Sequence, residues 1–182
     1  MSTLRMLRQE RGWSLDTLAE RSGTTKSYLS KVERGFNTPS IAVAIKLAGA
    51  LGVEVTEVFG ETASSAHIEL TRQADHAQAS KKPDDGSPYA GLATRISGKH
   101  MLPFVIHPPT EPEGCVFKEH AGDEFVVVQS GRVELSFPDR VEQLGVGDTA
   151  YFRGGIPHHF RSLDGHPAQV LVVIAAADPA RS

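Results

Sequence analysis

The sequence of 182 residues predicts two domains, an all-α bundle of short helices followed by an all-β sandwich or barrel. Apolar residues recur at helical spacing over residues 1–60, whereas short β-rich runs bounded by Pro and Gly recur from residue 92 onward. A small, polar segment at 61–67 separates the two patterns. We therefore expect a helical domain at 1–60, a linker at 61–67 and a second domain at 68–182.

Composition restricts the class of protein. With 40% hydrophobic and 23% charged residues the chain is typical of a folded globular protein, and no apolar run approaches the roughly 20 residues that cross a bilayer. No apolar segment of a secretory signal follows the first arginines, so we expect a cytoplasmic protein with no membrane partner. The single cysteine, Cys115, excludes an intrachain disulfide and a zinc finger built on several thiolates.

Charge is distributed unevenly along the chain. Residues 1–60 carry eight Lys and Arg against six acidic residues, a balance of +2, whereas the remainder carries −5 and brings the total to −3. Because phosphate attraction is the sequence-independent part of nucleic-acid affinity, a polyanion would meet the N-terminal part first.

Two short helices are expected after residue 13. Ser14 is a favourable N-cap and Gly23 a helix stop for the first, whose apolar residues recur at i, i+3 and i+4. Thr25 caps the second, Leu29 and Val32 mark its buried stripe, and it ends at residues 34–35.

Further helices complete the domain. Pro39 is expected at the first position of a helix that reaches Gly52, because the missing N–H costs nothing there. A short helix closes the unit at Phe59, which makes five short helices in all.

The pair of helices around Gly23 has the pattern of a helix-turn-helix, whose second helix presents its N-terminal end to base edges of DNA. Lysine and serine can donate to guanine, and Arg or Asn near a helix end suits phosphates. A bundle that only packs or dimerises would explain Leu29 and Val32 but not the outward polar set. The expected DNA-binding residues are Thr25, Lys26, Ser27, Ser30, Lys31, Arg34 and Asn37.

Residues 4–59 resemble the DNA-binding domain of the XRE family, which includes the lambda-type phage repressors. The stretch that carries the resemblance most clearly is Tyr28-Leu-Ser-Lys-Val-Glu-Arg-Gly35. The resemblance implies a lambda-repressor-like bundle with base contacts at Lys26, Ser27 and Lys31. Where many members carry Gln at the start of the preceding helix, this chain has Leu15 and Asp16.

Short strands are expected in the second domain, as in a sandwich or barrel. Residues 73–88, rich in Ala, Lys, Asp and Gly, are interpreted as a loop. The expected strands are Leu92–Ile96, Met101–His107, Cys115–His120, Phe125–Gln129, Val133–Phe137, Thr149–Phe152, His159–Ser162 and Val170–Ile174.

The segments Lys118-Glu-His120-Ala-Gly-Asp-Glu124 and Gly147 to His158 resemble the two signature motifs of the cupin barrels. The resemblance covers roughly residues 68–177 and implies an all-β double-stranded β-helix. In that family the first motif, His-x-His-x-x-x-Glu, and a further His in the second direct their ligands at a divalent metal. Here Lys118 replaces the first His, Arg153 the usual Pro and Ser162 the usual Asn.

Two imidazoles and a carboxylate remain, at His120, Glu124 and His158, and these are ligand types of a zinc or non-haem iron site. Strand alternation puts Lys118 and His120 on one face, and Glu124 can return on the next strand. The alternative keeps the histidines as hydrogen-bonded pocket residues and pairs Lys118 with Glu124. Both interpretations stay open at this point.

The two resemblances together imply a sequence-specific DNA-binding transcriptional regulator, a repressor and not an enzyme, controlled by a small molecule in the barrel. Its partners would be a double-stranded operator and a second copy paired through the barrel. Two alternatives are a metal-dependent cupin dioxygenase or isomerase with an accessory DNA-binding domain, and a barrel that only dimerises. A carboxylate effector is expected from the charged donors Lys118 and Arg153, in a cavity lined by Val126, Val128 and Phe160.

Overall fold

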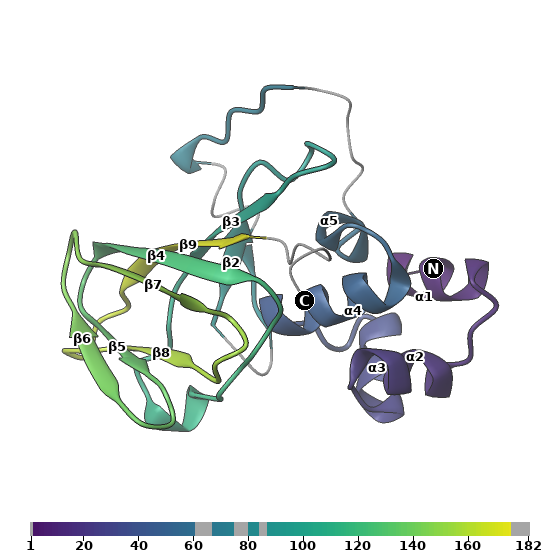
Figure 1. Cartoon of the computed structure of the whole chain (residues 1–182), viewed down its shortest axis with the longest axis horizontal. Helices are drawn as coiled ribbons and strands as arrows, with labels where there is room; N and C mark the ends of the chain where they lie inside the picture. Colours follow the sequence, from purple (N-terminus) through teal and green to yellow (C-terminus); the bar gives the residue numbers. More distant parts are fainter. Residues whose placement is uncertain (1, 61–66, 75–79, 84–86, 176–182) are drawn as a thin grey trace. The chain divides into compact units, whose positions relative to one another are not determined.

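The structure is a computed structural model that describes residues 2–60, 67–74, 80–83 and 87–175. The chain divides into two compact units (Figure 1). The first comprises residues 1–69 together with 94–98, and the second comprises 70–93 together with 99–182. Most of the expected linker, residues 61–66, lies outside the described residues.

The first unit is an all-α bundle, as predicted. Its core is built from fully buried leucines, among them Leu18, Leu29, Leu47 and Leu51. In the part of the chain that the structure describes, no helix has the length and apolar character needed to traverse a bilayer. The helices are α1 (Thr3–Glu10), α2 (Leu15–Ser22), α3 (Lys26–Glu33), α4 (Ile41–Leu51) and α5 (Val55–Val58).

Local signals set most of these helix boundaries. The side chain of Ser14 accepts the amide proton of Thr17 at the start of α2, and Gly23 ends this helix at a φ of 63°.

One predicted helix boundary was wrong. Pro39 is not the first residue of α4, because Ser40 takes the extended N-cap conformation and the helix begins at Ile41.

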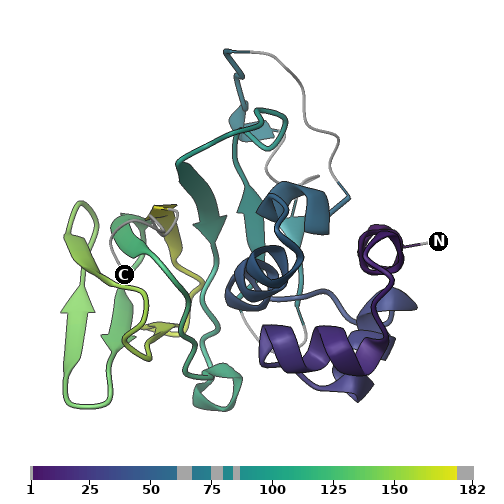
Figure 2. The ribbon, with the colours of Figure 1, turned by 45° about the vertical axis from the view of Figure 1, so that its right-hand side comes forward.

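The second unit consists of two antiparallel sheets, whose strands Figure 2 shows from a second direction. The larger sheet has the order β1-β2-β3-β9-β4-β7 and the smaller one β6-β5-β8. The strands are β1 (Ser80–Lys81), β2 (Tyr89–Gly91), β3 (Met101–Ile106), β4 (Asp123–Ser130), β5 (Val133–Ser136), β6 (Val141–Leu144), β7 (Thr149–Arg153), β8 (His159–Ser162) and β9 (Gln169–Ala175).

Alternation along β4 and β9 builds the interior of this unit. Val126, Val128, Val170, Val172 and Ile174 are each exposed by 2% or less, and their neighbours in the chain face outward. Glu124 lies on the same inner face of β4 and is also buried. The strand pattern therefore delivers one carboxylate into an apolar interior.

Some expected strands were wrong. Residues 92–95 form bends and turns, with a φ of 50° at Ala93, and residue 96 forms only an isolated bridge. Strand β2 lies just before them at Tyr89–Gly91. The expected strand Cys115–His120 is not formed, and an isolated antiparallel bridge joins Lys118 to His158 in this segment. Strand β6 was not predicted, and β1 lies inside the segment 73–88 that was interpreted as a loop.

Candidate DNA-binding surface and candidate metal centre

The helix-turn-helix is formed by α2 and α3, with the left-handed Gly23 in the turn. Thr25 caps α3, because its hydroxyl accepts the amide proton of Tyr28 at 3.2 Å. Leu29 and Val32 are buried, as predicted. The cap at Thr25 sets where α3 begins, and the burial of Leu29 and Val32 determines which face of the helix points outward.

The structure leaves most of the expected DNA-binding residues at the surface. Thr25, Lys26, Ser27, Lys31 and Arg34 are exposed, whereas Ser30 and Asn37 are half-buried. Arg34 folds back on its own helix, where its Nε donates to the carbonyl of Ser30 at 3.1 Å. Its guanidinium lies 5.1 Å from the ring centre of Phe36.

An ion pair that the sequence analysis missed links the first turns of α2 and α3. Lys26 Nζ lies 2.8 Å from Asp16 Oδ2, although both side chains are more than 60% exposed. The nearest signal in the sequence was the departure from the family pattern at Leu15 and Asp16.

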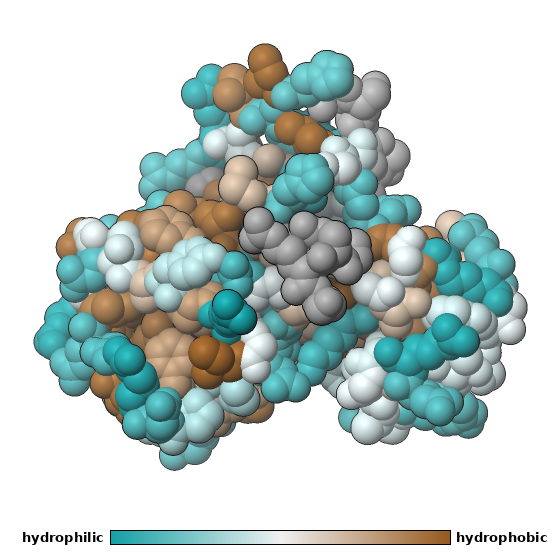
Figure 3. Space-filling view, viewed as in Figure 1, coloured by the Kyte–Doolittle hydropathy of each residue, from teal (hydrophilic) through white to brown (hydrophobic). Residues whose placement is uncertain are grey.

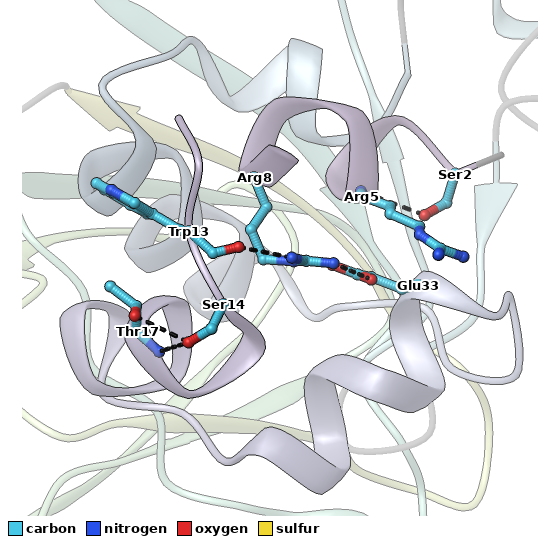
Figure 4. A network of polar contacts seen from close by, with 7 residues as sticks. All are labelled: Ser2, Arg5, Arg8, Trp13, Ser14, Thr17 and Glu33. Atoms are coloured by element: carbon cyan, nitrogen blue, oxygen red, sulfur yellow. Dashed lines mark hydrogen bonds and ion pairs between the residues drawn. The ribbon is translucent and has the colours of Figure 1, made fainter. Parts of the chain in front are cut away.

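A second ion pair fastens α3 to α1, as Figure 4 shows. Arg8 donates to both carboxylate oxygens of Glu33, at 2.7 and 3.0 Å, and to the carbonyl of Trp13 at 2.7 Å. The Arg8 and Glu33 side chains are only 11% and 7% exposed. Hydrogen bonding to Glu33 is the main reason that the pKa of Arg8 rises above its ordinary value, against the opposing effect of burial.

In the second unit His120, Glu124 and His158 converge, and their candidate ligand atoms lie within 4.8 Å of one another. Oε2 of Glu124 is 2.7 Å from Nε2 of His120 and 3.3 Å from Nε2 of His158. All three residues are buried, with exposures of 5%, 2% and 5%. We call this cluster the triad.

Each histidine of the triad is oriented by a backbone carbonyl. Nδ1 of His120 lies 3.0 Å from the carbonyl oxygen of Ala121, and Nδ1 of His158 lies 2.7 Å from that of Ile156. Because a carbonyl oxygen only accepts, both Nδ1 atoms carry a proton. Each Nε2 then turns toward Glu124 either a lone pair, when the ring is neutral, or a second N–H, when the ring is protonated. Backbone carbonyls orient metal-ligating histidines in this way.

The carboxylate of Glu124 stays ionised in this environment. Burial by itself would raise its pKa, but the hydrogen bonds and positive charge of the two histidines outweigh burial and lower the pKa below the ordinary value. Lone pairs on two nitrogens and a carboxylate at these distances need a positive centre among them. The triad therefore fits a divalent cation, and a proton on an imidazole is the alternative.

The expected effector residues are placed differently from one another. Val126, Val128 and Phe160 are buried in the interior. Lys118 exchanges both backbone hydrogen bonds with His158, each at 2.9 Å, so their side chains project from the same face. Arg153 is exposed on β7, next to the buried Phe152.

Comparison with known families identifies both units. Residues 4–58 match the model described as "Helix-turn-helix", of the HTH_3 family, and residues 104–174 match the model described as "Cupin domain". The first match spans α1 to α5, and the second contains the whole triad.

Two matches that cover most of this chain carry the name of a transcriptional regulator. The HTH-type transcriptional regulator SutR of Escherichia coli (strain K12) is 28% identical over 162 residues, which cover 88% of this chain and 85% of SutR. A crystal structure of an HTH_3 family transcriptional regulator from Vibrio cholerae matches with a TM-score of 0.71 at 23% identity, covering 97% of this chain and 94% of that one.

The fold also resembles an enzyme, hydroxypropylphosphonic acid epoxidase from S. wedmorenis. The TM-score is 0.52 at 20% identity, and 94% of each chain is covered. At this identity the likeness concerns the fold alone, and the named relative SutR favours a regulator over an enzyme. The chain belongs to the DNA-binding HTH-type transcriptional regulators that join an XRE-type helix-turn-helix domain to a cupin domain.

Proposed function

We propose that the protein is a repressor that binds a specific operator as a homodimer in the cytoplasm and is controlled by a small anion bound in the cupin barrel. The observation that carries this proposal is the combination of an outward polar set on α3 with a buried polar triad in the other unit. Effector binding changes operator affinity only if the effector binds the two arrangements of the protein unequally.

On the DNA side, we assign base contacts to Lys26, Ser27, Ser30 and Lys31, and phosphate contacts to Arg34 and Asn37, with Thr25 capping the helix. Replacing Lys31 with Ala should weaken cognate binding by roughly 1–3 kcal/mol and relax preference at one position. Replacing Arg34 with Ala should weaken binding to all sequences alike.

Both variants are titrated at fixed salt against the cognate duplex and a scrambled duplex. Lys31→Ala would lose its assigned role if its two losses were equal. Arg34→Ala serves as the internal reference because a phosphate contact carries no sequence information.

On the sensor side, His120, Glu124 and His158 would hold zinc or iron, and Lys118 faces the same interior. When bound, the metal supplies a second positive centre beside the Lys118 ammonium. An anion such as a carboxylate is the ligand that two cations favour. Because Arg153 is exposed on β7, we assign the charged donor to Lys118.

Replacing Lys118 with Met tests this assignment by removing the ammonium while keeping a long side chain. Binding of mono- and dicarboxylates should weaken about tenfold or more, since a hydrogen bond to a charged group contributes roughly 1.5–3 kcal/mol. Metal content should stay unchanged. Lys118→His should instead raise metal affinity and weaken the carboxylates, and unchanged carboxylate affinity in both variants would contradict an anion bridge.

The outer face of the larger sheet supports the homodimer. Pro103, Val173, Phe125 and Tyr151 are neighbours across β3, β9, β4 and β7, and the last two are 40% and 67% exposed. Hydrophobic residues are visible over the strand unit in Figure 3. A second copy presents the same apolar row, and a two-fold axis would pack the two rows against each other.

A further inference from the structure

The ion pair between Asp16 and Lys26 lies in the part of a helix-turn-helix that contacts base edges. Lys26 is the first residue of α3, and Asp16 is in the first turn of α2. The two side chains lie 2.8 Å apart although that of Asp16 is 66% exposed and that of Lys26 is 61% exposed. Burial therefore does not explain their contact. A carboxylate at a DNA-binding surface opposes phosphate attraction, and it therefore calls for a reason in base recognition.

The pair offers a donor beside an acceptor. After donating to Asp16, the Lys26 ammonium retains two protons, and the carboxylate retains lone pairs. In the major groove a G·C base pair presents the reverse pattern, with the guanine acceptors N7 and O6 beside the cytosine N4 donor. O6 and N4 are hydrogen-bonded to each other, so their separation of about 2.9 Å is close to that of the side-chain pair.

The other base pairs fit less well. In this orientation C·G places a donor under the ammonium and acceptors under the carboxylate. A·T keeps the adenine N7 acceptor near the ammonium, but it places the N6 donor at the central position and the thymine O4 acceptor under the carboxylate. T·A offers the central acceptor and donor, but it has a methyl group where guanine has N7, and it turns the adenine N7 acceptor toward the carboxylate. G·C is therefore the base pair that gives the ammonium two acceptors and the carboxylate a donor, with no methyl group under the ammonium and no N7 acceptor beside the carboxylate.

We propose that Asp16 and Lys26 act as one unit that selects a G·C base pair, with guanine under Lys26, in each half-site of the operator. The inference rests on the operator binding proposed above. Lys26 provides the donor to guanine. Asp16 is the specificity-determining residue because its carboxylate disfavours any base pair without a donor where cytosine has N4.

The test is selection of binding sites from a random duplex library with the full chain, followed by titration of the selected duplex at fixed salt. We expect one G·C position per half-site at which replacement by T·A, A·T or C·G weakens binding roughly 5- to 150-fold, the range of one good base contact. Asp16→Asn should reduce this preference to a few-fold, and Lys26→Gln should remove it.

Glu20→Gln is the matched control, because it makes the same change of charge at another exposed position of α2. Both neutralising variants should bind scrambled DNA slightly more tightly, but only Asp16→Asn should relax the base preference. The inference is overturned if Asp16→Asn keeps the wild-type preference or if Glu20→Gln relaxes it equally. Selection that enriches no sequence would refute operator binding itself, which is a different result.

Discussion

A glycine determines where the His120 ring lies. A Cβ built on Gly154 would stand 2.3 Å from Cε1 and 2.4 Å from Nδ1 of that ring, and 2.9 Å from the carbonyl oxygen of Gly122. No positive φ is recorded for Gly154, so glycine is needed there for space and not for backbone conformation. The amide of His120 donates to the Gly154 carbonyl at 2.9 Å, which keeps the two segments in this close approach.

Replacing Gly154 with Ala should therefore displace the His120 ring and lower metal affinity by about 10- to 100-fold, the usual range for groups that position a ligand. Metal content after dialysis against limiting zinc or iron is the measurement. Gly155→Ala is the control, because a Cβ at Gly155 has no neighbouring atom within 4 Å. Equal metal content in both variants would show that the ring does not depend on Gly154.

Among the elements, α3 depends on α1 through the pair formed by Arg8 and Glu33. Breaking this part-buried ion pair removes charge-assisted hydrogen bonds and should cost about 1.5–3 kcal/mol. Glu33→Gln should accordingly lower the free energy of unfolding of the helical unit by an amount near that range. The midpoint of the thermal unfolding transition measures this loss. Glu10→Gln, at an exposed site on α1, should change stability by less than about 0.5 kcal/mol. Similar transitions for the two variants would contradict an anchoring role for Glu33.

Helix ends were predictable because a cap depends on a few adjacent residues, as at Ser14, Gly23 and Thr25. Strands depend on partners far along the chain, which explains why residues 92–96 turn where a strand was expected. Strand β6 escaped notice because none of its residues is buried, so its sequence carries no alternating apolar signal.

The triad was predictable from motif spacing, since strand alternation and the second motif bring His120, Glu124 and His158 together. The two ion pairs of the helical unit were not. Arg8 and Glu33 are 25 residues apart, and Lys26 and Asp16 are 10 apart, so no helical or strand period relates them. Only the packing of α1, α2 and α3 brings these charges into contact.

For the molecule as a whole, operator affinity should depend on pairing through the larger sheet. Phe125→Asp or Tyr151→Lys places a charge on its apolar outer row and should convert the homodimer into a monomer, with a large loss of operator affinity. Sedimentation of the full chain at micromolar concentration measures this. Val141→Asp is the control, since Val141 is 58% exposed on the smaller sheet.

Three outcomes are distinguishable. A dimeric wild type with monomeric outer-row variants supports this interface. Dimers in every variant would place the interface elsewhere, and a monomeric wild type would contradict the homodimer.

The position of β9 has a consequence for the protein during its synthesis. This strand lies between β3 and β4 and is the last one that the structure describes, so the larger sheet cannot close until residues 169–175 have been made. The helical unit leaves the ribosome earlier and can fold by itself in the meantime. A product that stops before Gln169 would keep its recognition helix but lose the sheet through which we propose that two copies pair, so it should bind operators weakly and should not respond to the effector.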